Sequence, residues 1–243
     1  MKLKMEQLSF SYSTKNIFCG LSFQVNQGEF VSIVGPSGCG KSTILNILAG
    51  ILVPQKGKIY VDEQQIYGIS THFSYMPQND LLFPWKTILE NVCLYGKIHH
   101  KEEDVRKQAL ANFPIFGLEG YENVYPSALS GGMRQRAAFL RTALCESDIL
   151  LLDEPFGALD VITRTDMQDW LVSMKEQLNK TTLFVTHDID EAIYLSDRIF
   201  ILGGNPSSIT KIITIEEPLR TREWLYEQGE LRTNIYQFIK ENK

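Results

Sequence analysis

The chain has 243 residues, of which 44% are hydrophobic and 22% are charged, and its formal net charge is −5. This length suits one large α/β domain, or one domain with a small inserted lobe. The apolar share excludes a disordered or collagen-like chain, and the acidic balance argues against a large basic face, so we expect no nucleic-acid partner.

Cysteine usage and hydropathy set two further limits. The four cysteines are widely spaced and form no Cys-x-x-Cys pair, which disfavours zinc and favours reduced thiols in a cytosolic protein. The first ten residues lack a signal-peptide pattern. No apolar stretch approaches the ~20 residues of a membrane span. If the protein works at a membrane, we expect it to dock on something already embedded there.

The first third of the chain is predicted to hold strands around a glycine-rich loop. Apolar patterns predict strands at residues 2–10, 21–25, 30–34, 58–62 and 73–76. A helix is predicted at residues 41–49, with Gly50 as its stop.

Residues 79–146 change to helical patterns, which we interpret as a helical subdomain inserted into an α/β core at 1–78 and 147–220. The predicted helices of this subdomain are 87–95, 101–112 and 131–145. The core resumes with strand 149–152, helix 161–178, strand 181–186, a short helix from Asp188 and strand 198–202. This alternation predicts a mainly parallel sheet, and residues 221–243 are predicted to form a helical tail interrupted by Gly229.

The glycine-rich loop fits the phosphate-binding pattern G-x-x-x-x-G-K-[ST], with the required strand before it and helix after it. Glycines let backbone amides turn inward around phosphate oxygens, and the helix presents its positive end to the anion. We expect Lys41 to reach the β and γ phosphates and the Ser42 hydroxyl to bind Mg²⁺. The predicted ATP-binding residues of the loop are Gly35, Pro36, Ser37, Gly38, Cys39, Gly40, Lys41, Ser42 and Thr43.

A second motif is the apolar run 149–152, which ends in Asp153 and Glu154. In open α/β sheets, ligands bind at the carboxyl ends of the strands. Asp153 is therefore expected to hold Mg²⁺ through water, and Glu154 to polarise the attacking water as a general base. A plain strand end is the alternative, which the phosphate loop upstream disfavours.

A third motif is the start of a long helix, where Ser130 precedes Gly131 and Gly132. Ser130 has the position of an N-cap. The glycines bare the helix amides, which makes a second anion site. The two helix starts are too far apart in sequence for local geometry to assign them to one site.

Together these motifs resemble the nucleotide-binding subunit of an ABC transporter, over nearly the whole chain. The resemblance implies a P-loop NTPase (ABC ATPase) core with an antiparallel β N-terminal subdomain and an inserted helical subdomain. It assigns Gln78 to a Mg²⁺ and water contact, His187 to a switch near the γ-phosphate and Tyr12 to stacking on adenine. Taken alone, Tyr12 also fits a core aromatic and His187 a turn residue.

The resemblance also implies a mechanism in which two cassettes pair head to tail and clamp ATP between them. Catalysis would then depend on Glu154, His187, Gln78 and Lys41, and the metal on Ser42, Gln78 and Asp153. The partner cassette would supply Ser130, Gly131, Gly132 and, from the Gly157-Ala158-Leu159-Asp160 segment, Asp160. ATP and Mg²⁺ are the implied cofactors.

The segment 79–85 resembles the importer branch for nitrate, sulfonates, taurine and thiamine-precursor pyrimidines, and 136–142 leans toward the pyrimidine precursors. Such a cassette docks on a separate permease at the cytoplasmic face of the membrane, and an extracytoplasmic binding protein delivers the solute. Phe83 and Trp85 are candidates for the apolar contact with the permease; alternatively they pack within the helical subdomain.

Three rival functions stay open. They are a non-transport ABC ATPase, an exporter cassette and a small-molecule kinase with the same phosphate loop. The chain has neither a tandem cassette nor long coiled coils, and a kinase needs neither the Ser130 motif nor His187. GTP is disfavoured because no Asn-Lys-x-Asp sequence occurs.

Overall fold

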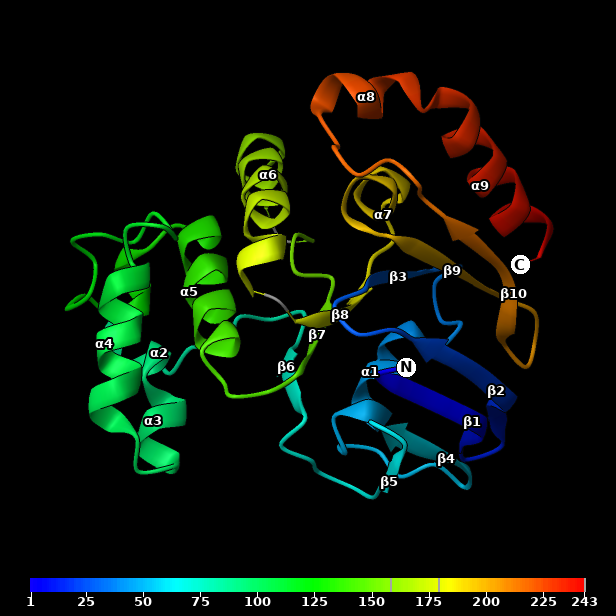
Figure 1. Ribbon diagram of the computed structural model, residues 1–243, viewed down its shortest axis with the longest axis horizontal. Helices are drawn as coiled ribbons and strands as arrows, with labels where there is room; N and C mark the ends of the chain where they lie inside the picture. The colour runs from blue at the N-terminus through cyan, green and yellow to red at the C-terminus, as the bar shows by residue number, and fades with distance from the viewer. Residues whose placement is uncertain (158, 179, 243) are drawn as a thin grey trace.

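The computed structural model describes residues 1–157, 159–178 and 180–242. An antiparallel sheet is built from the N-terminal quarter of the chain, in the order β2-β1-β4-β5 (Figure 1). Its strands are β1 (Leu3–Tyr12), β2 (Lys15–Val25), β4 (Lys56–Val61) and β5 (Gln64–Ile66). Buried and more exposed residues largely alternate along β1, as expected of a strand with one face on the core.

A second, six-stranded sheet has the order β10-β9-β3-β8-β7-β6. Its strands are β3 (Phe30–Val34), β6 (Phe73–Met76), β7 (Ile149–Asp153), β8 (Thr181–Val185), β9 (Arg198–Gly203) and β10 (Ser208–Thr214). All neighbours pair in parallel except β10, which is antiparallel to β9. Every residue of β3, β7 and β8 is buried, which explains their continuous apolar sequences.

The helices fall into three groups along the chain (Figure 1). Those of the core are α1 (Lys41–Leu48), α6 (Val161–Leu178) and α7 (Ile189–Leu195). The helical lobe, at one end of the molecule, contains α2 (Ile88–Val92), α3 (Leu94–Ile98), α4 (Glu102–Asn112), the short 3-10 helix η1 (Pro126–Ala128) and α5 (Gly131–Ala143). The tail forms α8 (Arg222–Glu227) and α9 (Gly229–Glu241). None of the described helices is both long and apolar enough to cross a membrane.

The large sheet lies between two hydrophobic cores. Phe30 and Val34 of β3 belong to the core shared with the helical lobe and the tail, whereas Val31 and Ile33 belong to the core shared with α1 and the antiparallel sheet. Because successive side chains of a strand point to opposite faces, one short apolar strand contributes to both cores.

Most predicted elements are present, and the differences have local causes. The strands predicted at 30–34 and 73–76 match β3 and β6, and Gly229 separates α8 from α9. Strand β2 begins six residues before the predicted residue 21, because its first half includes polar residues and shifts register against β1. Strands β5 and β10 were not predicted. Both are edge strands with polar residues, so their apolar signal is weak.

The helix predicted at 87–95 is wrong as a single element. Thr87 and Glu90 form a reciprocal capping box that starts α2 one residue later than predicted. Helix α2 ends at Val92, and Cys93 leaves the regular helical conformation before α3 begins at Leu94. The four cysteines are free thiols, as expected.

Candidate active site

The glycine-rich loop joins β3 to α1, and Gly40 is the N-cap residue of α1. Gly40 has φ 100°, and a Cβ there would lie 2.5 Å from Ile17 and 2.6 Å from Phe18, so a larger residue cannot be accommodated. Among the described residues, no side chain caps α1. The first amides of α1 therefore remain available to an anion.

Lys41 lies at the start of α1 and is 92% buried, with a relative exposure of 8%. Its Nζ donates hydrogen bonds to the carbonyl oxygens of Gly35, at 2.9 Å, and Pro36, at 3.1 Å. These bonds hold the ammonium group against the inner side of the loop. Cys39 does not face a ligand with its side chain, because it packs in the core, and burial raises the pKa of its thiol.

A hollow of about 390 Å³ opens beside the loop, within the size range of ligand pockets. Its lining comes from the loop, α1, the β1–β2 hairpin and the end of β7: Tyr12, Lys15, Ile17, Ser37, Gly38, Gly40, Lys41, Ser42, Thr43 and Glu154. Gly35, Pro36 and Cys39 are not part of the lining. The loop, Tyr12 and Glu154, distant in sequence, are thus brought together as predicted.

Tyr12 ends β1 and leaves 47% of its surface exposed, so it is not a core residue. Its ring packs edge-on against Phe10, with the ring centroids 4.8 Å apart. Lys15 pairs with Tyr12 in the hairpin register and also lines the hollow. Sequence reasoning missed Lys15, although a cation three residues after an aromatic in a hairpin was a usable signal.

Asp153 ends β7 and is 95% buried, with a relative exposure of 5%. The Ser42 hydroxyl donates to its Oδ1 at 2.9 Å, and the Tyr75 hydroxyl donates to its Oδ2 at 3.2 Å. Burial raises the pKa of Asp153, and the two hydrogen bonds oppose that shift. Tyr75 was missed because its relevance depends on β6 pairing with β7, where Tyr75 aligns with Leu151.

The donor set around Asp153 fits a magnesium ion. A carboxylate and a hydroxyl are hard oxygen ligands, and Mg²⁺ in phosphate-transfer sites takes only one or two protein ligands beside phosphate and water. The described residues contain no cluster of three or more His, Cys, Asp or Glu side chains placed to hold a metal by themselves.

Glu154 follows β7 in a left-handed conformation, with φ 46°, which is uncommon for a residue with a side chain. Its amide donates to Val185 O at 2.9 Å, so the sheet holds this conformation in place. Its Oε2 accepts a hydrogen bond from Gln78 Nε2 at 3.2 Å and lies 3.2 Å from His187 Nδ1. Three predicted catalytic residues, from three separate segments, therefore meet at one carboxylate oxygen.

The segments predicted to act in trans lie apart from the hollow but adjacent to each other. Ser130 is exposed and caps α5, its Oγ accepting from the Met133 amide at 3.3 Å. A Cβ on Gly132 would lie 2.2 Å from Thr163 Cγ2 of α6. Asp160 accepts from the Thr163 amide at 3.0 Å, and this bond lowers the pKa of Asp160. Residue 158 of the same predicted segment lies outside the described residues.

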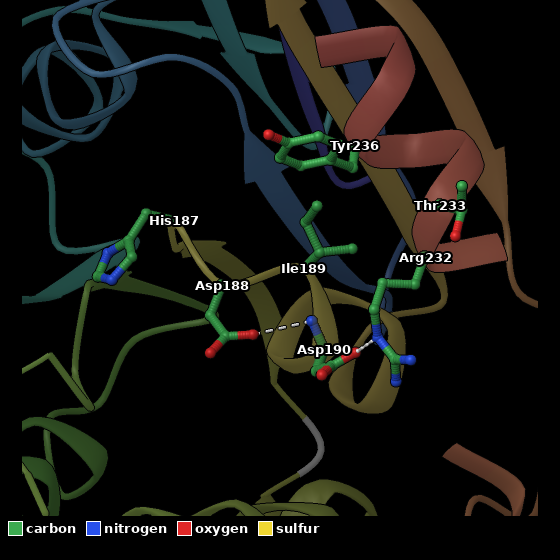
Figure 2. A pocket seen from close by; sticks show the side chains of 7 residues that line it. All are labelled: His187, Asp188, Ile189, Asp190, Arg232, Thr233 and Tyr236. Atoms are coloured by element: carbon green, nitrogen blue, oxygen red, sulfur yellow. Dashed lines mark hydrogen bonds and ion pairs between the residues drawn. The ribbon is translucent and has the colours of Figure 1, made fainter. Parts of the chain in front are cut away.

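A second cavity, of about 430 Å³, lies between α7 and the tail, and His187 lines it (Figure 2). Asp188 caps α7 by accepting from the Asp190 amide at 2.8 Å. Asp190 in turn pairs with Arg232 of α9. Arg232 and Tyr236, both on α9, line the cavity from the side of the tail. The tail therefore packs next to the turn that carries His187.

Residues 18–157 match the ABC transporter family. The chain is similar to the formylaminopyrimidine import ATP-binding protein ThiZ of Halalkalibacterium halodurans, with 49% identity over 84% of this chain and 80% of that protein. It is also similar to the aliphatic sulfonates import ATP-binding protein SsuB of Bacillus cereus, with 41% identity over 92% of this chain and 88% of that protein.

Among solved structures, the chain resembles the ATP-binding cassette MJ0796, captured as a dimer in a post-hydrolysis state with ADP and Pi. The TM-score is 0.76 at 30% identity, covering 88% of this chain and 99% of that one. The structure of cbiO1 from Clostridium perfringens, part of the transporter complex cbiONQ, gives a TM-score of 0.79 at 26% identity, with 98% of both chains covered. The chain therefore belongs to the ABC transporter family and is an ATPase of that family.

Proposed function

We propose that this ATPase is the energy-supplying subunit of a solute importer and that it hydrolyses ATP in the hollow beside the glycine-rich loop. The meeting of Gln78 and His187 at the carboxylate of Glu154, which lines that hollow, is the observation that carries the proposal. A nucleotide-binding protein without hydrolytic activity has no need of a strained carboxylate aimed at its phosphate site.

Each side chain has a role that follows from its chemistry and position. Lys41 neutralises phosphate charge, and Tyr12 offers an exposed ring for adenine. Glu154 accepts a proton from the attacking water, while Gln78 and His187 orient Glu154 and the water between them. Ser42 and Asp153, together with Gln78, would hold Mg²⁺, which supplies charge neutralisation at the phosphates when bound.

We infer that two copies, or two paired cassettes, complete each other's sites through Ser130, Gly131, Gly132 and Asp160. Support comes from the contacts that bring two of these segments together, because Gly132 and Asp160 both lie against Thr163. Next to Asp160, Val161 and Ile162 expose 76% and 75% of their surfaces. Two adjacent exposed aliphatic residues are better explained by a partner surface than by solvent.

The permease contact is proposed at the segment 79–85. Arg141 donates to Leu81 O at 2.8 Å, and the buried Asn91 side chain bonds both backbone groups of Phe83. With its backbone held in this way, the segment leaves Phe83 38% and Trp85 69% exposed. The exposure of Trp85 disfavours the alternative that these aromatics only pack within the lobe. It supports docking at the cytoplasmic face of the membrane.

The names of the relatives suggest the class of solute. The relative at 49% identity imports a formylaminopyrimidine, and the one at 41% imports aliphatic sulfonates. We propose a formylaminopyrimidine-like solute, with sulfonates as the second candidate, delivered by an extracytoplasmic binding protein. Uptake of each solute by cells with and without this chain, with its permease present, separates the two.

The proposed function is tested by two measurements on the purified chain. We expect release of phosphate from ATP with water alone, without any small-molecule phosphate acceptor, and co-purification of a membrane permease when the chain is isolated from cells. Phosphate release that depends on an added acceptor would instead indicate a kinase. Hydrolysis of ATP by a chain with which no permease co-purifies would favour a non-transport ABC ATPase.

A further inference from the structure

Glu191 of α7 is a buried carboxyl that the mechanism above does not use, with only 5% of its surface exposed. Both of its oxygens accept hydrogen bonds. Thr186 Oγ1 donates to Oε2 at 2.5 Å, and Gln168 Nε2 of α6 donates to Oε1 at 3.0 Å. Burying an ionised carboxylate costs free energy unless hydrogen bonds compensate it. An apolar side chain would fill the same space without that cost, so packing alone does not explain a glutamate here.

The bond to Thr186 matters because of where Thr186 lies. Its hydroxyl accepts from the Asp188 amide at 3.0 Å while donating to Glu191. One hydroxyl thus connects the residues on either side of His187, and the Glu191 carboxylate fixes the direction of that hydroxyl. The conformation of the turn that presents His187 to Glu154 is therefore linked to Glu191.

The bond to Gln168 ties the same carboxylate to α6. One turn before Gln168, Arg164 donates from NH2 to Leu159 O at 3.0 Å. Leu159 precedes Asp160, the N-cap of α6 that is proposed to act across the dimer. The turn of His187 is therefore bonded through Glu191 to α6, the same helix whose Arg164 side chain holds the Leu159 carbonyl next to Asp160.

The surrounding charges define the titration of Glu191. Burial raises its pKa to about 7, and the charge of Asp188 adds to the shift, whereas the bonds from Thr186 and Gln168 and the charge of Arg164 oppose it. Other charged groups around α7 have their own partners: Arg232 of α9 pairs with Asp190, and Arg222 of α8 pairs with Asp169. Strand β3, which packs against α7, contains no charged residue. The ionised carboxylate fits the network, because it can accept from both donors at once.

We propose that Glu191 is a positioning residue for ATP hydrolysis, which holds the His187 turn through Thr186 and couples it to α6 through Gln168. The proposal rests on the proposed role of His187. Glu191 touches neither the loop nor the hollow, so its loss should lower kcat and leave ATP affinity unchanged.

The test compares two near-isosteric changes in the full chain, Glu191→Gln and Thr186→Val, with Thr186→Ser as the conservative variant. Asp190→Asn is the matched control, since this neighbouring carboxyl on α7 bonds outward to Arg232. We expect Glu191→Gln and Thr186→Val each to lower kcat by about 10-fold to 100-fold, with the Kd for ATP unchanged. Thr186→Ser and Asp190→Asn should retain wild-type kcat.

Two further measurements separate positioning from general stability. The double variant Glu191→Gln/Thr186→Val should lower kcat by less than the product of the two single-variant factors, because both single variants alter the same Thr186–Glu191 contact. The acid limb of the wild-type kcat profile should include a transition near pH 7 that Glu191→Gln lacks. If Glu191→Gln does not fold, Thr186→Val against Thr186→Ser decides the matter alone.

His187→Ala, measured in parallel, separates the two possible failures. If His187→Ala abolishes hydrolysis while Glu191→Gln and Thr186→Val keep wild-type kcat and pH profile, the positioning role is overturned and the switch role stands. If His187→Ala itself keeps wild-type kcat, the proposed role of His187 is wrong, and the role assigned to Glu191 is overturned with it.

Discussion

At the scale of single residues, the proposed functional side chains include several whose backbone conformation or burial is unfavourable. Glu154 occupies a left-handed conformation, and Asp153 and Glu191 are carboxyls with 5% of their surface exposed. Such features cost free energy and persist only where the surrounding structure compensates them. In this chain the compensation is visible as hydrogen bonds from Ser42, Tyr75, Thr186 and Gln168.

Replacing the proposed base tests its role directly. Glu154→Gln should bind ATP but hydrolyse it at least about 100-fold more slowly, because an amide cannot accept the proton of the attacking water. The variant should also accumulate as a closed dimer, detectable by size-exclusion chromatography with ATP. Glu227→Gln, an exposed carboxyl on α8, is the control. Near-normal turnover of Glu154→Gln would remove Glu154 from the base role.

Glu191 also predicts how stability depends on pH. Its folded-state pKa of about 7 is above the ordinary glutamate value of 4.5, so the folded state binds this proton more tightly than the unfolded state. Its contribution to stability is complete below about pH 4.5 and is lost as pH rises through 7, by about 3 kcal/mol at most. Urea unfolding between pH 5 and 8.5 should show a smaller decline for Glu191→Gln than for the wild type. Parallel declines in both proteins would contradict the raised pKa.

At the scale of elements, the start of α5 carries two adjacent glycines whose surroundings differ. Gly131 has no atom closer than 3.9 Å to a Cβ built on it, whereas a Cβ on Gly132 would overlap Thr163 Cγ2 at 2.2 Å. Gly132 therefore lets α5 approach α6, in addition to any contact with nucleotide. The sequence pattern alone treats the two glycines as equivalent.

Alanine substitution should separate these duties. Gly132→Ala should destabilise the fold by about 1–3 kcal/mol through overpacking. Gly131→Ala should be neutral or stabilising by up to about 1 kcal/mol, because alanine favours the helix. Chemical denaturation measures both, and Thr163→Ser should rescue Gly132→Ala by removing the Cγ2 methyl. Equal destabilisation by the two alanines would contradict the close approach of α5 to α6.

At the scale of the whole molecule, we propose that each chain presents one half of two different sites. The loop and its hollow form one surface, while Ser130, Gly132 and Asp160 gather elsewhere through the contact of Gly132 with Thr163. The dimeric, nucleotide-bound relative is consistent with joining these halves across two subunits. One subunit would then bind ATP but not hydrolyse it efficiently.

Complementation tests this division. Ser130→Arg should abolish hydrolysis without weakening ATP binding by the monomer, and Lys41→Ala should lose ATP binding itself. A mixture of the two inactive variants should recover hydrolysis, because the mixed dimer contains one intact pair of Lys41 and Ser130. Ser130→Thr, which keeps a capping hydroxyl, is the control. Failure of the mixture to recover activity, or weakened monomer binding by Ser130→Arg, would contradict the assignment in trans.

Local sequence patterns were sufficient to identify the phosphate loop in its strand–helix context, the carboxylates that end β7, the capped start of α5 and the α/β class. These depend on local spacing, which the chain carries wherever it folds. The limits at residues 79 and 146 and the site assignments remain predictions, and the structure places Gln78 and His187 at the carboxylate of Glu154.

The residues that support that site from distant parts of the sequence could be identified only from the packing of the folded chain. Tyr75 reaches Asp153 because β6 pairs with β7, and Lys15 reaches the hollow because the β1–β2 hairpin closes there. The environment of Glu191 could not be predicted from the sequence, because its burial and its bond from Gln168 depend on the packing of α6 against α7. The physical reason is that burial and hydrogen-bond partners between separate segments depend on sheet order and helix packing, which no local pattern encodes.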